Sequence, residues 1–175
     1  MSKQKQIAFL KFYEPIHCKF EKFCRARVYG EMEYSDLMNE TLLIAFTKFN
    51  HIKNKNSLLS YLCGVSIKIL ANDNRKKKAK TKMTNTDLIL IDVNSNTDKD
   101  VSITLLYEAM SLLPLQQREC LILFEIIGFS IKEIMEIQNS SESAVKQRLK
   151  RGRERLKLII TFESNYKRGE VKHEL

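Results

Sequence analysis

Apolar residues recur at helical spacing along almost the whole chain, and few residues interrupt the pattern. A spacing of three or four places apolar side chains on one helix face, whereas a half-buried strand needs strict alternation. Only two prolines and five glycines occur in 175 residues, so the chain has few enforced helix breaks. The sequence therefore predicts an all-α protein, in which helices bury their apolar faces against one another.

The first block of predicted helices, residues 1–78, is expected to form a compact bundle. Its helices cover residues 6–29, 36–49 and 57–78. Ser35 and Asp36 are placed to cap the second of these helices, and a polar loop at 50–56 separates it from the third. Each helix carries an apolar stripe, so the three can enclose a small core.

Between the helical blocks, residues 79–100 lack a sustained apolar stripe and change from basic to acidic. The run DLILID at 87–92 could be a short strand, but one strand without a partner is not stable. We expect a flexible linker that carries an apolar patch.

A second helical block covers residues 101–160, and a tail follows at 161–175. Pro114 and Gly128 bound the helices in the first part of this block. Those helices cover residues 101–113 and 115–127. The sequence thus predicts two small helical domains joined by a flexible linker.

The second block ends in a short helix, a turn and a long basic helix, which is helix-turn-helix spacing. Ser130 and Glu133 have the spacing of a capping box, and Ser141 is placed to cap the long helix. The apolar stripe of the long helix comprises Val145, Leu149 and Leu156. This stripe is predicted to dock on the short helix, with Gly152 allowing the backbones to approach.

The other faces of the long helix are strongly basic, with Glu142 and Glu154 as the acids between residues 140 and 157. In a major groove, Arg and Lys suit guanine and Gln suits adenine, while further cations hold phosphates. The candidate contacts to duplex DNA are Ser141, Ser143, Lys146, Gln147, Arg148, Lys150 and Arg151. We assign phosphates to Arg148, Arg153 and Arg155. The alternative is a solvated surface helix, although such helices usually alternate charge sign.

A second candidate surface lies on the helix over 57–78. Tyr61, Lys68, Asn72 and Arg75 fall roughly on one face, which runs into the basic cluster RKKKAK. An aromatic ring among cations suits single-stranded nucleic acid, where bases stack and phosphates need charge. From the residues alone, a core role for Tyr61 and a solvated helix end fit equally well.

The composition and net charge of the whole chain limit the classes of function that it could have. A net charge of +9 favours an anionic partner such as nucleic acid, although AT-rich coding alone would also enrich Lys. The four cysteines form no C-x-x-C pair, so we expect buried thiols rather than a metal site. No catalytic arrangement is visible, so we expect neither an enzyme nor a cofactor. No apolar run approaches the roughly 20 residues of a membrane span, which predicts a cytoplasmic protein without membrane insertion.

Together the two blocks resemble an alternative RNA polymerase sigma factor of the extracytoplasmic-function type in the sigma-70 family. Residues 36–49, DLMNETLLIAFTKF, resemble region 2.2 of that family, and residues 57–78 resemble its regions 2.3 and 2.4. Residues 105–157 resemble region 4 along their whole length. The chain departs from the family where Tyr61 replaces a usual Trp and Ala144 a usual Thr.

The resemblance implies that the first domain binds and melts the minus-10 promoter element and that the second reads the minus-35 element as duplex. Its implied polymerase contacts are Asp36, Asn39 and Glu40. Its implied minus-10 contacts are Asn54, Lys55, Asn56, Tyr61, Lys68, Asn72 and Arg75. The implied partners are core RNA polymerase, promoter DNA and an anti-sigma factor. The alternative is a stand-alone helix-turn-helix regulator that binds duplex DNA as a dimer.

Overall fold

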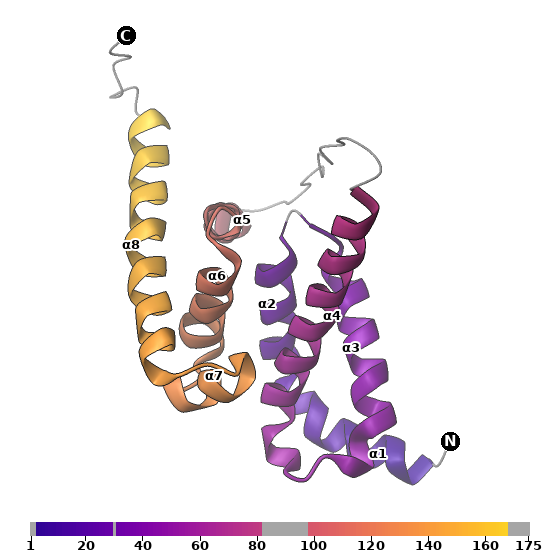
Figure 1. The fold of residues 1–175 in the computed structure, drawn as a ribbon. Helices are drawn as coiled ribbons and strands as arrows, with labels where there is room; N and C mark the ends of the chain where they lie inside the picture. Colours follow the sequence, from indigo (N-terminus) through magenta and orange to yellow (C-terminus); the bar gives the residue numbers. More distant parts are fainter. Residues whose placement is uncertain (1–2, 30, 82–97, 168–175) are drawn as a thin grey trace.

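The computed structural model describes residues 3–29, 31–81 and 98–167, and every regular element in these ranges is helical (Figure 1). The N-terminal bundle contains α1 (Lys3–Tyr13), η1 (Glu14–Ile16), α2 (His17–Val28), α3 (Tyr34–Lys48), η2 (Phe49–His51), η3 (Lys55–Ser57) and α4 (Leu58–Thr81). The C-terminal bundle contains α5 (Asp98–Ser111), α6 (Leu115–Leu121), η4 (Ile122–Ile127), α7 (Ile131–Gln138) and α8 (Glu142–Lys167). The predicted all-α class is confirmed.

In the N-terminal bundle, α2, α3 and α4 bury their apolar stripes against one another. Phe20 and Phe23 from α2 are fully buried, and so is Leu62 from α4. Phe9 from α1 meets the rings of Phe46 and Phe49 edge-on at centroid distances of 5.4 and 5.3 Å. These edge-to-face contacts stabilise the base of the bundle beyond the area that they bury.

The predicted cap of α3 is wrong. Its N-cap is Glu33, which has an extended backbone and makes no side-chain capping hydrogen bond. Ser35 and Asp36 lie inside the first turn, because the Asp36 amide already donates to the Glu33 carbonyl oxygen at 3.2 Å. The partly buried Tyr34 ring packs against the core. We attribute to this packing that the helix begins at Tyr34, before the position that the capping residues Ser35 and Asp36 predict.

The C-terminal bundle follows the predicted helices closely, with one difference. Residues 122–127 form the π-helical segment η4, which the apolar pattern did not predict. Gly128 ends the segment with a φ of 84°, a left-handed conformation that favours glycine. The wider turn of a π-helix changes the side-chain register, so that Ile122, Leu123 and Ile127 are all buried.

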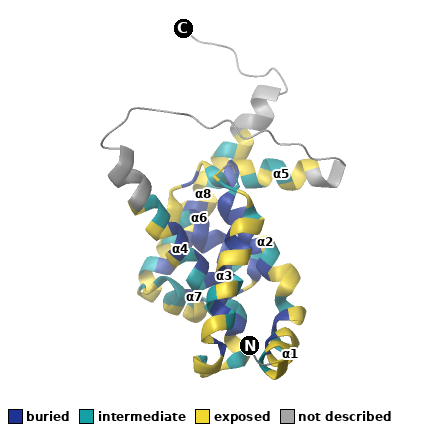
Figure 2. Ribbon diagram, turned by 90° about the vertical axis from the view of Figure 1, so that its right-hand side faces the viewer, coloured by how far each residue is buried: buried dark blue, intermediate teal, exposed yellow. Residues whose placement is uncertain are grey.

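The two bundles pack against each other in this structure. α2 contacts η4 and α4 contacts α7, and buried residues of both bundles belong to one continuous core. Figure 2 shows the buried residues towards the centre of the molecule. The predicted linker and its DLILID run fall mostly on residues 82–97, which lie outside the described residues. Of the four thiols, Cys18 is exposed and the others are buried.

Candidate nucleic-acid interface

The helix-turn-helix begins with the predicted capping box. The Ser130 amide donates to Glu133 Oε2 at 2.8 Å, and the Glu133 amide donates to Ser130 Oγ at 3.3 Å. The hydrogen bonds from Ser130 lower the pKa of the Glu133 carboxyl below its ordinary value. α7 ends at Asn139 with a φ of 46°, and Ser141 Oγ accepts from the Ala144 amide at 3.3 Å, which caps α8. The start of both helices is thus set by local hydrogen bonds.

α8 is anchored by its apolar stripe. Val145 and Leu149 are buried, and Leu156 is half-buried. A Cβ atom at Gly152 would lie 3.0 Å from Leu121 Cδ1, which is in α6 rather than α7. The prediction that Gly152 allows two helices to approach closely is therefore confirmed. The predicted partner, the short helix α7, is wrong, because the helix next to Gly152 is α6.

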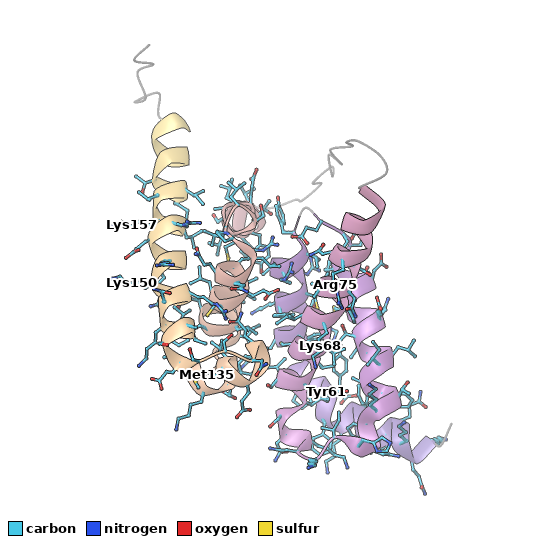
Figure 3. All side chains as sticks on the ribbon, viewed as in Figure 1. Tyr61, Lys68, Arg75, Met135, Lys150 and Lys157 are labelled. Atoms are coloured by element: carbon cyan, nitrogen blue, oxygen red, sulfur yellow. The ribbon has the colours of Figure 1, made fainter. Side chains whose placement is uncertain are left out.

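The outward face of α8 carries exposed polar and basic side chains from its first three turns. Exposed among the predicted contacts are Ser141, Ser143, Lys146, Gln147, Lys150 and Arg151. Figure 3 shows Lys150 and Lys157 pointing away from the rest of the molecule. Lys146 pairs with Glu142 at 2.6 Å, and this contact lowers the pKa of the Glu142 carboxyl. Both side chains of that pair are exposed, so Lys146 can exchange Glu142 for another anion at little cost.

Two arginines that we assign to phosphates also make contacts within the protein. Arg148 is half-buried, and its Nη1 atom donates to Gln138 Oε1 at 2.9 Å and to Ser140 Oγ at 2.8 Å. Arg153 donates through Nε to Glu125 Oε1 at 2.8 Å. Arg148 thereby ties α8 to the turn, and Arg153 ties α8 to η4. Their partners lie on other elements, where helical spacing cannot reveal them.

The candidate strand-binding face on α4 is assembled largely as predicted. Tyr61 is half-buried, while Lys68, Asn72 and Arg75 are exposed, and Arg75 donates to Asn72 Oδ1. Figure 3 shows Tyr61, Lys68 and Arg75 along one side of α4. The sequence did not decide whether Tyr61 belongs to the core or binds nucleic acid. In the structure Tyr61 is half-buried, and this position is compatible with both packing against the core and stacking on a base.

The loop before α4 is ordered by its own side chains. Asn54 Oδ1 accepts from the Asn56 amide at 3.0 Å, and Asn54 Nδ2 donates to Ser57 Oγ at 2.9 Å. The Lys55 ammonium lies 5.1 Å from the Phe49 ring centroid. A cavity of about 320 Å³ joins this loop to α4. Its lining includes Asn54, Ser57, Tyr61 and Lys68, together with Glu136 and Ile137 from α7.

The residues assigned to polymerase lie on the outer face of α3. Asp36, Asn39 and Glu40 are all exposed there. Leu43 continues the same face, and its side chain is 63% exposed. The i+4 spacing from Asn39 could have identified Leu43 from sequence.

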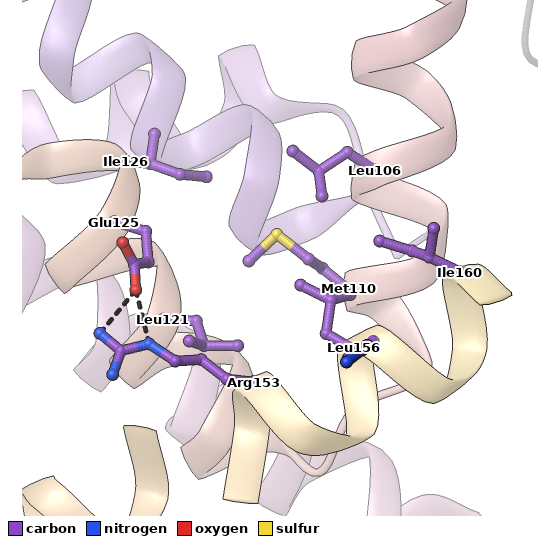
Figure 4. Close-up of a pocket in the computed structure, with 9 residues that line it drawn as sticks. Leu106, Met110, Leu121, Glu125, Ile126, Arg153, Leu156 and Ile160 are labelled. Carbon is purple, nitrogen blue, oxygen red and sulfur yellow. Dashed lines mark hydrogen bonds and ion pairs between the residues drawn. The ribbon is translucent and has the colours of Figure 1, made fainter. Parts of the chain in front are cut away.

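A second surface, which the sequence analysis missed, is an apolar groove between α5, α6, η4 and α8 (Figure 4). It has a volume of about 340 Å³. Its apolar lining consists of Leu106, Met110, Leu121, Ile126, Leu156 and Ile160, and the charged residues Glu125, Arg153 and Lys157 also line it. Four separate elements contribute, so no single periodic stripe marks the groove.

Two kinds of site are not found in the part of the chain that the structure describes. No cluster of three or more potential metal ligands occurs there. Within the same residues, no helix combines the length and hydropathy needed to cross a bilayer.

Comparison with known proteins gives a family for the C-terminal bundle and a fold for the whole chain. Residues 103–156 match the family described as "Sigma-70, region 4". The sigma factor RpoE, solved in complex with the anti-sigma factor NepR from Bartonella quintana, superposes with a TM-score of 0.76 at 18% identity, covering 87% of this chain and 98% of RpoE. CnrH, solved in complex with the cytosolic domain of CnrY, superposes with a TM-score of 0.65 at 16% identity, covering 89% of each chain. No curated protein sequence matches the chain significantly.

The family match covers the whole helix-turn-helix, including the buried stripe and the basic outer face of α8. The structural match extends over both bundles. Residues 103–156 are therefore similar to region 4 of the sigma-70 family, and the chain has the two-bundle helical fold of the sigma factor RpoE.

Proposed function

We propose that this chain is a sigma factor of the extracytoplasmic-function type, which binds core RNA polymerase in the cytoplasm and directs it to promoters. In this proposal, the first domain, residues 1–78, binds and melts the minus-10 element. The second domain, residues 101–160, reads the minus-35 element. Residues 79–100 link the two domains, and residues 161–175 form a C-terminal tail. The observation that carries this proposal is the division of α8 into two faces: Val145 and Leu149 are buried, while its basic N-terminal turns face solvent. No catalytic step is part of the proposal.

For duplex reading, α8 would enter the major groove with its N-terminal turns towards the base edges. Gln147 suits adenine, while Lys150 and Arg151 suit guanine, and each good pair contributes about 1–3 kcal/mol of discrimination. Arg148 has a different role in this scheme. It holds the turn through Gln138 and Ser140, and so sets the angle at which α8 leaves α7.

For strand opening, the α4 face supplies a ring and cations. Extruding a base from a duplex costs a few kcal/mol. Stacking on an aromatic side chain such as Tyr61 recovers about 1–3 kcal/mol per base, and Lys68 and Arg75 can neutralise phosphates. The cavity beside Asn54 and Ser57 offers polar groups and room next to that ring. Captured-strand contacts would therefore offset much of the cost of melting.

Two further surfaces suit protein partners. The face with Asp36, Asn39, Glu40 and Leu43 combines acidic, amide and apolar groups, and we assign it to core polymerase. RpoE is seen with an anti-sigma factor, so we also propose an anti-sigma partner for this chain. The apolar groove, which Arg153 and Lys157 also line, fits an amphipathic helix with acidic edges, and we assign it to that partner.

The test is reconstitution of the full chain with core RNA polymerase on promoter DNA. We expect a stable complex and transcription from a specific promoter, with the double variant Lys150→Ala/Arg151→Ala losing most of that transcription. The double variant Lys11→Ala/Lys19→Ala, which removes two exposed cations from α1 and α2, serves as the charge-matched control. A chain that binds palindromic duplex alone as a dimer, and does not associate with polymerase, would instead be a stand-alone regulator.

A further inference from the structure

Three glycines lie in the part of the chain that the structure describes, and two of them have a structural reason. Gly128 has a φ of 84°, a backbone conformation that favours glycine. Gly152 lies where a Cβ atom would approach Leu121 Cδ1 to 3.0 Å. The third, Gly64, is in the interior of α4, where neither reason applies.

The structure around Gly64 does not require a residue without a side chain. α4 is one continuous helix, and Gly64 is not among the residues with a positive φ. Beyond its chain neighbours and the backbone of its own helix, no atom lies within 4 Å of the position that a Cβ would occupy. Glycine in a helix interior is less favourable than alanine. Folding alone would therefore favour alanine at position 64.

Gly64 occupies the middle of the candidate strand-binding face. It follows Tyr61 by three residues and precedes Lys68 by four, which places the three on one side of the helix. Along the helix axis, Gly64 lies about 4.5 Å from Tyr61 and about 6 Å from Lys68. Figure 3 shows Tyr61 and Lys68 along the same side of α4, and all three residues line the cavity of about 320 Å³. The bare backbone at Gly64 is thus between a ring that can stack on a base and a cation that can hold a phosphate.

We propose that Gly64 is a contact residue for the captured single strand of DNA, at which a deoxyribose lies directly against the backbone of α4. The inference rests on the proposed function, because the strand is the one assigned to Tyr61 and Lys68. The occupant at Gly64 is a sugar, since the base stacks on Tyr61, the phosphate meets Lys68, and the sugar joins the two. Close approach of a ligand to the backbone is a use of glycine that packing in the free protein does not reveal.

A side chain at position 64 would affect binding rather than folding. A methyl group there meets open space in the free protein, so Gly64→Ala should fold and should resist urea better than the unmodified chain. In the complex the same methyl group would hold the sugar away from the helix, and the base could no longer lie flat on Tyr61. Losing part or all of one stacking contact corresponds to about 5- to 150-fold in affinity. The expected signature is a more stable protein that binds the strand more weakly.

The test measures the affinity that the full chain adds to core polymerase for single-stranded DNA. The probes are labelled strands of oligo(dA), oligo(dC), oligo(dG) and oligo(dT), each about 12 nucleotides long. We expect Gly64→Ala to weaken binding about 10-fold, and Gly64→Leu, with a larger side chain at the same open position, about 100-fold. Asn74→Ala is the control, because it also raises the helix propensity of α4 but lies about 120° round the helix from Lys68. It should leave strand affinity unchanged, and none of these changes alters the net charge.

Tyr61→Ala, measured in parallel, separates this inference from the proposed function. If Tyr61→Ala loses strand affinity while both Gly64 variants bind as the unmodified chain does, the role of Gly64 is overturned and the proposed function stands. If the unmodified chain adds no strand affinity, or Tyr61→Ala does not reduce it, the assignment of the α4 face to the strand fails and the role of Gly64 fails with it. Equal losses in Asn74→Ala and Gly64→Ala would assign the effect to a stiffer helix and overturn the contact. A Gly64→Ala chain that unfolds at lower urea concentration would contradict the open position that the inference requires.

Discussion

Replacing Gly152 with alanine tests whether the contact between α8 and α6 needs a residue without a side chain. A Cβ atom there would lie 3.0 Å from Leu121 Cδ1, 3.2 Å from Leu121 Cγ and 3.5 Å from Gln117 Cβ. The first two distances are below an ordinary carbon–carbon contact of about 3.5–4.0 Å. Leu121 is 2% exposed and cannot swing into solvent. The added methyl group must therefore push α8 away or displace a packed leucine.

Two opposing effects set the magnitude. Alanine is favoured over glycine in a helix interior by about 1 kcal/mol. Forcing an extra methyl group into a packed core costs about 1–3 kcal/mol. We expect Gly152→Ala to lower the free energy of unfolding by about 1 kcal/mol. Gly64, inside α4, has nothing within 4 Å of its Cβ position. Gly64→Ala should therefore show the helix-propensity gain alone and stabilise the protein by about 1 kcal/mol.

The assay is urea denaturation of the full chain followed by circular dichroism, with both variants measured beside the unmodified protein. A background of Leu121→Ala provides a further check, because the methyl group then has room. On that background Gly152→Ala should stabilise as Gly64→Ala does. If Gly152→Ala alone stabilises the protein as much as Gly64→Ala, the close approach of α8 to α6 is not a constraint, and the reasoning from these distances is wrong.

Two further predictions concern the helix-turn-helix. Ser130→Ala removes the acceptor of the Glu133 amide and should lower the unfolding free energy by about 1 kcal/mol at neutral pH. Because Ser130 holds the pKa of Glu133 below its ordinary value, this loss should shrink as acidification protonates the carboxyl, and a loss that does not change with pH would contradict the assigned hydrogen bonds. Arg155→Ala, at an exposed position of α8 that we assign to a phosphate, should weaken duplex binding and reduce the slope of log affinity against log salt by about 1, as fluorescence anisotropy of labelled promoter DNA can measure; an unchanged slope would remove Arg155 from the phosphate contacts.

Elements whose signals are local were predictable from sequence. The capping box at Ser130 and the cap at Ser141 involve residues within three positions of one another, and both are present. The break at Gly128 follows from a left-handed backbone that other residues rarely adopt. The cap of α3 was mispredicted although its signal is local, because Tyr34 packs against the core and moves the helix start.

Contacts between distant elements could not be predicted in the same way. The hydrogen bonds of Arg148 to Gln138 and Ser140 remove it from the set of free cations on α8, and nothing in the spacing of basic residues distinguishes it from Lys150. The apolar groove likewise joins residues from α5 to α8. A cationic side chain can bind DNA only if it is not already held by other residues of the protein. The tertiary structure determines which residues surround each cation.

The sequence by itself determined the helices, most of their ends, the helix-turn-helix and the basic face of α8, because each depends on residues within a few turns of one another. Only the tertiary structure decided that Gly152 meets α6 rather than α7, and that Arg27 and Glu119, 92 positions apart, form a buried pair between the bundles. Periodicity states which side of a helix is apolar, but it carries no information about which other helix covers that side. The choice among possible partners is made by shape and charge complementarity across the whole core.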